Sequence, residues 1–281
     1  MAQTPPVVLT IAGFDPGSGA GVTADIKTIA ALGCYGVACI TGLTVQSTKG
    51  VRRVEAVDAG VVADTLAELV SDIEIAAVHV GMLGYEKVAR AVADFLASRK
   101  IPNVVLDPIL KSSSGADLVD AVGKRLMTDR LLPLATVVTP NIDEASALTG
   151  MTVNDTEQMR AAAKKLHEMG ASAVVITGGH LEKAIDLLSF TSKRGIEQEV
   201  FKSARLKSNS THGTGCAFAT SVACHLALGR GLPEAVLLAK AYVAAAISHA
   251  HPLGHGVGPV HHLYRMQQQR RVLAADPEPV A

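Results

Sequence analysis

Short apolar runs and longer amphipathic runs alternate along most of the chain. The short runs, bounded by Gly, Pro or Asp, are typical of strands, whereas apolar residues at helical spacing indicate helices. The predicted strands cover residues 7–12, 37–45, 52–57, 77–80, 104–106, 136–138 and 173–177, with a hairpin over 184–190 and 196–201. The predicted helices cover residues 20–32, 61–72, 87–99, 155–169, 216–228 and 233–248. This alternation predicts an α/β protein with a mostly parallel central sheet and helices on both faces.

Length and composition suit one large domain. The chain has 281 residues, of which 48% are hydrophobic and 3% aromatic. We expect a single domain over residues 1–273, with a core of Ala, Val, Leu and Ile. The last segment, residues 274–281, is expected to be a disordered tail.

Charge and targeting signals exclude several classes of protein. The 26 basic and 26 acidic residues balance, which argues against a nucleic-acid or membrane surface as partner. No apolar run is long enough for a transmembrane helix, and the first residues lack the basic segment of a secretory signal. The four cysteines form no CxxC pattern, so neither structural zinc nor a disulfide framework is favoured. We therefore expect a cytoplasmic protein with reduced thiols.

Glycine-rich and polar segments follow the predicted strands at their carboxyl ends. They are GFDPGSGAG, VGMLGY, LDPILKSSSG, TPNIDEA and ITGGH. In an open α/β sheet these ends meet at one edge, where ligands bind. The sequence therefore predicts one ligand site built from these loops.

The first of these loops, residues 13–21, matches no standard nucleotide-binding motif. Val22 stands where a dinucleotide fingerprint needs its third glycine, and the chain contains no Walker A motif. The glycines favour close approach of a ligand to the backbone. A tight turn that needs positive φ is the competing interpretation.

Residues 139–145 combine a helix start with candidate magnesium ligands. Asn141 and Glu144 have the spacing of a capping box. Together with Asp107, which ends another strand or caps the turn after it, they are also candidates to organise Mg²⁺, which proteins hold with few carboxylates plus phosphate oxygens. The capping and metal interpretations are compatible.

Residues 212–216 form a glycine turn before a helix that is expected to begin at Cys216. The backbone N–H groups of such a junction favour an anion, including a phosphoryl group. The same field is expected to lower the pKa of the Cys216 thiol. A general base, a covalent nucleophile and a buried small residue all remain open for Cys216.

Histidines near the C-terminus favour turn and surface roles over a metal site. Pro252 and the neighbouring glycines preclude a helical i,i+4 pair, and no acidic residue lies among the histidines. The histidines are His249, His251, His255, His261 and His262.

The order of the motifs, from about Val8 to about His262, resembles the hydroxymethylpyrimidine/phosphomethylpyrimidine kinases of thiamin biosynthesis, in the ribokinase-like superfamily. The matching segments include GFDPGSGAGVTADIKT, LTVQSTKGV, VGMLG, LDPILKSSSG, TPNIDEASALTG, VVITGGH, STHGTGCAFATSVA and GHGVGPVHH. The resemblance implies a three-layer α/β/α sandwich with a small β flap, usually as a homodimer. It also implies transfer of a phosphoryl group from MgATP to 4-amino-5-hydroxymethyl-2-methylpyrimidine, and then to its monophosphate.

The resemblance assigns catalytic and substrate-binding residues. Cys216 matches the base of this branch, and the anion hole maps onto Gly213, Thr214 and Gly215. Gln46 matches the pyrimidine-binding glutamine, whose carboxamide can pair with an aminopyrimidine edge.

Further residues complete the implied site. Gly13 and Asp15 would lie at the pyrimidine pocket, with Val45 and Met82 covering the ring. The resemblance and the loop positions together place residues at the ATP phosphates and at Mg²⁺. Those for the phosphates are Asn141, Thr177 and Lys111, and those for the metal are Glu144 and Asp107.

Two departures from the family pattern concern phosphate-binding lysines. Thr177 stands where the family often has Lys, and residues 112–115 leave Lys111 displaced from the family's position. Two other functions therefore stay open. One is a pyridoxal or pyridoxine kinase of the same branch, and the other is a non-catalytic pyrimidine-binding module.

Overall fold

The computed structural model describes residues 4–112, 115, 118–179 and 184–266, and its centre is one sheet. The sheet has nine strands in the order β3-β2-β1-β4-β5-β6-β7-β8-β9. The strands are β1 (Val7–Phe14), β2 (Tyr35–Ser47), β3 (Gly50–Ala56), β4 (Ala77–Val80), β5 (Val104–Leu106), β6 (Val137–Val138), β7 (Ala173–Gly178), β8 (Ala184–Ser192) and β9 (Gly195–Ser203). Strands β1, β2, β4, β5, β6 and β7 pair in parallel, while β3, β8 and β9 pair antiparallel at the two edges.

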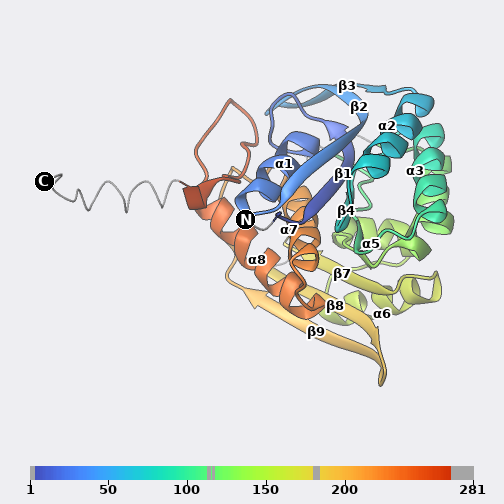
Figure 1. The fold of residues 1–281 in the computed structure, drawn as a ribbon. Coiled ribbons are helices and arrows are strands. Elements are labelled where there is room, and N and C mark those ends of the chain that lie inside the picture. The colour runs from blue at the N-terminus through green and yellow to red at the C-terminus, as the bar shows by residue number, and fades with distance from the viewer. Residues whose placement is uncertain (1–3, 113–114, 116–117, 180–183, 267–281) are drawn as a thin grey trace, which may run out of the picture.

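Helices cover both faces of this sheet (Figure 1). The helices are α1 (Gly21–Ala31), α2 (Ala59–Asp72), α3 (Glu86–Ser98), α4 (Ala121–Leu126), α5 (Ile142–Thr149), α6 (Thr156–Glu168), α7 (Thr214–Ala227) and α8 (Leu232–Ser248). One hydrophobic core joins the sheet to α2, α3, α5 and α6, and a second joins it to α1, α7 and α8. The predicted three-layer α/β/α fold is confirmed.

The hydrophobic pattern explains why the central elements form. Strands β4 and β5 are buried along their whole length, and apart from His79 in β4 they are apolar, as central parallel strands generally are. Helix α7 is buried on nearly all sides between the sheet and α8, so its sequence is apolar all round rather than along one stripe. Each Leu or Ile buried in these cores contributes about 1.5–3 kcal/mol of transfer free energy.

The segment between β5 and β6 was not predicted. It contains α4, a π-helical turn over Met127–Leu131 and a 3₁₀ turn over Leu132–Leu134. Gly123 and Pro133 interrupt any long helical pattern there, so the sequence shows no clear periodicity.

A small β flap extends from one edge of the sheet, as the family resemblance implies. Strand β2 pairs with β1 as far as Leu43, and from Gly42 onward it pairs with β3. The tip of the flap packs on a loop near the C-terminus, because the N–H of Val257 donates to the carbonyl oxygen of Thr48 at 3.0 Å. That loop therefore holds the flap beside the carboxyl edge of the sheet.

No helix in the described part of the chain is both long and apolar enough to cross a membrane. The expected tail, residues 274–281, lies outside the described residues, as do residues 113–114 and the end of the ITGGH segment.

Candidate active site at the carboxyl edge of the sheet

The loop after β1 is organised by the carboxylate of Asp15. Its Oδ1 accepts the N–H of Gly17 at 2.7 Å, and its Oδ2 accepts those of Gly19 at 3.1 Å and Ala20 at 3.0 Å. Asp15 is buried, and burial alone would raise the pKa of its carboxyl group. The hydrogen bonds from His212 and from these amides outweigh burial and lower that pKa, so Asp15 is a carboxylate at neutral pH.

The turn of residues 213–216, which we call the anion turn, leads into α7. Gly213 is the N-cap, with φ of +81°, and α7 begins at Thr214. The prediction that the helix begins at Cys216 is therefore wrong by two residues, because glycine in the left-handed conformation starts the helix earlier. The first helical hydrogen bond runs from Ala217 N–H to the carbonyl of Gly213 at 2.9 Å, so the N–H groups of Gly215 and Cys216 have no carbonyl one turn earlier to bond.

The Cys216 side chain is buried under this turn, with 9% of its surface exposed. Burial raises the pKa of the thiol well above its ordinary value, and the carboxyl groups of Asp107 and Asp25 raise it further. A hydrogen bond from the backbone of Gly21 lowers it only in part. The expectation of a thiol acidified by the helix is wrong, because desolvation outweighs the helix field.

Two buried carboxyl groups, Asp107 and Glu144, lie in this region. Burial raises the pKa of Glu144 to about 8, and the charge of Asp107 contributes to that rise. Burial likewise raises the pKa of Asp107 to about 7, against a lowering effect of His79. Asp107 also lies beside the turn of residues 213–216, since a Cβ built on Gly215 would be 3.8 Å from its Oδ2.

This carboxyl pair fits a magnesium ion. Burial disfavours ionisation of these two carboxyl groups, and a cation bound between or beside them makes their ionised forms favourable. Mg²⁺ is commonly held by one or two carboxylates plus phosphate oxygens. Within the described residues no cluster of three or more His, Cys, Asp or Glu side chains forms a fuller metal site.

Asn141 and Thr177 lie side by side at the ends of β6 and β7. They form an isolated parallel bridge, with Thr177 N–H donating to the carbonyl of Pro140 at 2.9 Å. The Asn141 side chain completes a capping box with Glu144, and both bonds of the box measure 2.9 Å. The capping interpretation is confirmed. The charge of Asp107 still acts on the capped Glu144 carboxyl group.

Lys240, in α8, is a charged residue near the end of β7 that the sequence analysis did not predict for the site. Its Nζ lies 2.7 Å from Oδ2 of Asp186, which pairs with Thr177 across β7 and β8. Both side chains of this ion pair are largely buried. The sequence feature that could have indicated this ion pair is a single lysine in the otherwise largely apolar helix α8.

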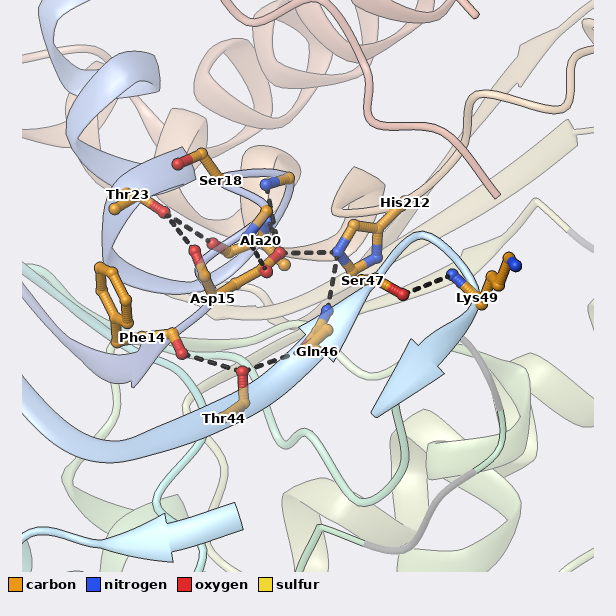
Figure 2. A network of polar contacts seen from close by, with 12 residues as sticks. Phe14, Asp15, Ser18, Ala20, Thr23, Thr44, Gln46, Ser47, Lys49 and His212 are labelled. Carbon is orange, nitrogen blue, oxygen red and sulfur yellow. Dashed lines mark hydrogen bonds and ion pairs between the residues drawn. The ribbon is translucent and has the colours of Figure 1, made fainter. Parts of the chain in front are cut away.

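Gln46 belongs to a polar chain that crosses from the flap to the anion turn (Figure 2). Its Nε2 lies 3.1 Å from Nε2 of His212, and the same imidazole nitrogen lies 2.8 Å from Oδ2 of Asp15. Thr44 Oγ1 lies 3.2 Å from Oε1 of Gln46 and donates to the carbonyl of Phe14 at 3.0 Å. His212, which directly precedes Gly213, thus connects the predicted pyrimidine-binding residue Gln46 to Asp15.

A cleft of about 140 Å³ opens beside this series of polar contacts, at Gln46 and His212. Its walls come from the flap, the anion turn and the loop near the C-terminus. The lining residues are Gln46, Ser47, Thr48, Lys49, Gly50, Val51, Ser112, His212, Gly256 and Val257.

The other predicted site residues divide into two groups. Met82 and Gly13 are in contact, since a Cβ on Gly13 would lie 2.2 Å from the methyl carbon of Met82. Val45 is 47% exposed and, by strand alternation, projects from the opposite face of β2 to Gln46. Lys111 is exposed and lines a separate cleft with Val119, Asp120 and Lys124. Gly13, Val45 and Met82 are thus not among the residues that line the cleft over Gln46. The role of Lys111 at the ATP phosphates stays a prediction.

Comparisons with known proteins agree with this architecture. The chain matches the phosphomethylpyrimidine kinase family over residues 15–261. It is 43% identical to the hydroxymethylpyrimidine/phosphomethylpyrimidine kinase of Streptomyces coelicolor, over 92% of this chain and 95% of that protein. It is 44% identical to the thiamine biosynthesis bifunctional protein ThiED of Geobacter sulfurreducens, over 94% of this chain but only 53% of that longer protein.

A solved structure shares the fold. Pyridoxal kinase of Bacillus subtilis, in complex with ADP, superposes with a TM-score of 0.84 at 34% identity, covering 94% of this chain and all of that one. Together with the family match, this similarity shows that the chain is a phosphotransferase of ribokinase-like fold that belongs to the phosphomethylpyrimidine kinase family.

Proposed function

We propose that this chain phosphorylates the hydroxymethyl group of 4-amino-5-hydroxymethyl-2-methylpyrimidine with ATP, and then phosphorylates the monophosphate, as a step toward thiamin diphosphate. The observation that carries the proposal is the link from Gln46 through His212 to the anion turn, at one cleft. A carboxamide suited to an aminopyrimidine edge is thereby joined to a turn suited to a phosphoryl group. That combination supports transfer between the two ligands.

The anion turn is the proposed seat of the transferred phosphoryl group. The N–H groups of Gly213, Gly215 and Cys216 and the hydroxyl of Thr214 are the donors it offers. Oriented amides need no rearrangement as charge shifts in the transition state, so they stabilise it efficiently. Asn141 and Thr177 are the proposed residues beside the ATP phosphates.

Magnesium is the proposed partner of the phosphates. Asp107 and Glu144 would hold it, and when bound it neutralises phosphate charge. Their raised pKa values fit residues that ionise with a cation present. Lys240 is ion-paired with Asp186, so it is not a simple replacement for the lysine absent at Thr177.

The proposed role of Cys216 is to position the substrate hydroxyl. It can accept the hydroxyl proton only as a thiolate, after its own proton has passed to water or to a phosphate oxygen. A thiol whose pKa is raised stays protonated at neutral pH, which argues against a standing thiolate nucleophile. We further propose a cytoplasmic homodimer, on the family resemblance and on the four reduced, buried cysteines.

A pyridoxal or pyridoxine kinase is the second candidate. The fold similarity to pyridoxal kinase supports it, because pyridoxine also carries a hydroxymethyl group on a flat nitrogen ring. Gln46 favours the aminopyrimidine, since pyridoxine has no exocyclic amine to pair with it.

The deciding experiment measures kcat/KM for both alcohols with MgATP. We expect the aminopyrimidine to be preferred by about tenfold or more. A preference for pyridoxine would overturn the main proposal, and ligand binding without ATP consumption would support a non-catalytic module.

A matched pair of variants tests Cys216 in the same assay. Cys216→Ala is expected to lower kcat about 100-fold or more. Cys224→Ala removes a buried thiol from the same helix, away from the anion turn, and is expected to keep most of the activity. Equal activity of the two variants would contradict the proposed role.

A further inference from the structure

The imidazole of His212 must carry a hydrogen on Nε2. That nitrogen lies 2.8 Å from the carboxylate oxygen Oδ2 of Asp15, which can only accept. Both the neutral ring with this tautomer and the charged ring place a hydrogen there. The bond therefore fixes Nε2 as a donor in either protonation state.

This donor decides which end of the Gln46 carboxamide faces His212. An NH₂ group 3.1 Å from Nε2 would place two donors face to face. The carboxamide oxygen at that position would instead accept the Nε2 hydrogen, which His212 then shares between Gln46 and Asp15. The two ends have almost the same shape, so the hydrogen-bond network decides between them. The oxygen therefore belongs toward His212.

The other end of the carboxamide agrees with this order. Thr44 has a single hydroxyl hydrogen, which it donates to the carbonyl of Phe14 at 3.0 Å. Toward Gln46, Thr44 Oγ1 can therefore only accept. The NH₂ of Gln46, turned toward Thr44, donates to that oxygen across the 3.2 Å separation. The second hydrogen of that NH₂ group is left for a ligand.

We propose that the Asp15–His212 pair locks the Gln46 carboxamide with its oxygen toward the anion turn, and so sets both the ring class and the ring orientation that the cleft accepts. His212 acts here as a positioning residue. The inference rests on the proposed function and deepens it.

The locked order dictates how an aminopyrimidine would bind. Its exocyclic amine donates to the Gln46 oxygen on the His212 side, and the adjacent ring nitrogen accepts from the Gln46 NH₂ on the Thr44 side. The hydroxymethyl group is attached next to the amine, so it too points toward His212. Because Gly213 follows His212 directly, this orientation aims the reacting hydroxyl at the turn of residues 213–216.

The test compares the aminopyrimidine alcohol with its analogue that lacks the amine, 5-hydroxymethyl-2-methylpyrimidine. The wild-type protein is expected to prefer the amine by about tenfold or more in kcat/KM. His212→Leu removes the donor, and we expect the preference to fall to about threefold or less, with the KM for ATP unchanged. His212→Gln places an NH₂ at a similar distance along the side chain, and we expect it to restore most of the preference.

Thr44→Val is an independent variant at the other end of the carboxamide. It removes the acceptor for the Gln46 NH₂, and we expect it to reduce the preference for the amine as well. Equal losses for both alcohols in His212→Leu, or an unchanged preference in both His212→Leu and Thr44→Val, would overturn the proposal. If the wild-type protein phosphorylates neither alcohol, the proposed function fails, and that result is distinct from a wild-type kinase whose preference ignores His212.

Discussion

The α-carbon of Gly213 packs against the carbonyl oxygen of Gly19, so closely that a Cβ at position 213 would lie 1.8 Å from that oxygen. Gly213 also has a φ of +81°, where side chains are strained. Two separate constraints therefore require glycine at the start of the anion turn, and one of them joins the turn to the loop after β1.

Gly213→Ala is expected to displace the anion turn. The collision pushes α7 away from Gly19, and a shift of that kind typically costs about 100-fold in kcat/KM. Gly229→Ala is the matched control, because Gly229 has a φ of +78° but no atom within 4 Å of its added Cβ. The control should lose only about 1 kcal/mol of unfolding free energy and keep its activity. Similar activity in the two variants would show that the contact with Gly19 does not matter.

Alkylation of Cys216 should report its raised pKa. Since burial and nearby carboxyl groups keep the thiol protonated, the rate of reaction with iodoacetamide should rise about tenfold per pH unit from pH 7 to pH 9. Peptide mapping by mass spectrometry distinguishes Cys216 from the other three cysteines. A fast rate that is constant across this pH range would mean that the thiolate is already formed.

Glu144→Gln should raise the free energy of unfolding at alkaline pH and lower the activity. The pKa of Glu144 is raised from 4.5 to about 8, so the folded protein holds a proton that the unfolded chain releases. Its contribution to stability is present below pH 4.5 and is lost as pH rises toward 8. Without metal, the variant should therefore match the wild type at pH 4.5 and exceed it by a few kcal/mol at pH 8, roughly.

The same variant separates this effect from the magnesium role. MgATP should raise the unfolding midpoint of the wild type more than that of Glu144→Gln, and the variant should need more Mg²⁺ for half-maximal rate. The Gln oxygen can still accept the Asn141 N–H, so the helix cap is preserved. An unaltered Mg²⁺ requirement would remove Glu144 from the proposed metal site.

His262 should make the fold sensitive to mild acid. Burial lowers the pKa of its imidazole from 6.5 to about 4, so the unfolded chain binds a proton that the folded protein refuses. Stability contributed by this group falls as pH drops from 6.5 toward 4, by about 2 kcal/mol between pH 7 and pH 5.

His262→Leu should flatten that part of the pH profile in urea unfolding. His255→Leu, at an exposed position, is the control and should keep the wild-type profile. A wild-type profile in His262→Leu would mean that another group causes the acid sensitivity.

Sequence pattern predicted the central fold well, because local features determine it. The strands at 77–80 and 104–106 were predicted at their observed bounds, since buried apolar runs there end at glycine or aspartate. The convergence of loops follows from parallel topology alone. Alternation along β2 could also have placed Val45 on the opposite face from Gln46, had it been applied to the flap.

Contacts between distant segments were not predictable in the same way. His212 was visible as part of a turn, but its bonds to Asp15 and Gln46 depend on how three separate segments meet. The pKa of Cys216 was predicted in the wrong direction, because its burial, and next to it the nearby carboxyl groups of Asp107 and Asp25, depend on segments far away in sequence. The ion pair of Lys240 with Asp186 is likewise set by the packing of α8 on the sheet edge.

The packing of Thr48 on the loop around Gly256 has a consequence for how the protein is made. The flap wall of the cleft, at residues 46–51, leaves the ribosome well before the opposite wall at Gly256 and Val257. A nascent chain that has reached α8 contains every strand of the sheet but lacks the loop that holds the flap. The cleft is therefore completed only after the whole sheet can already have formed.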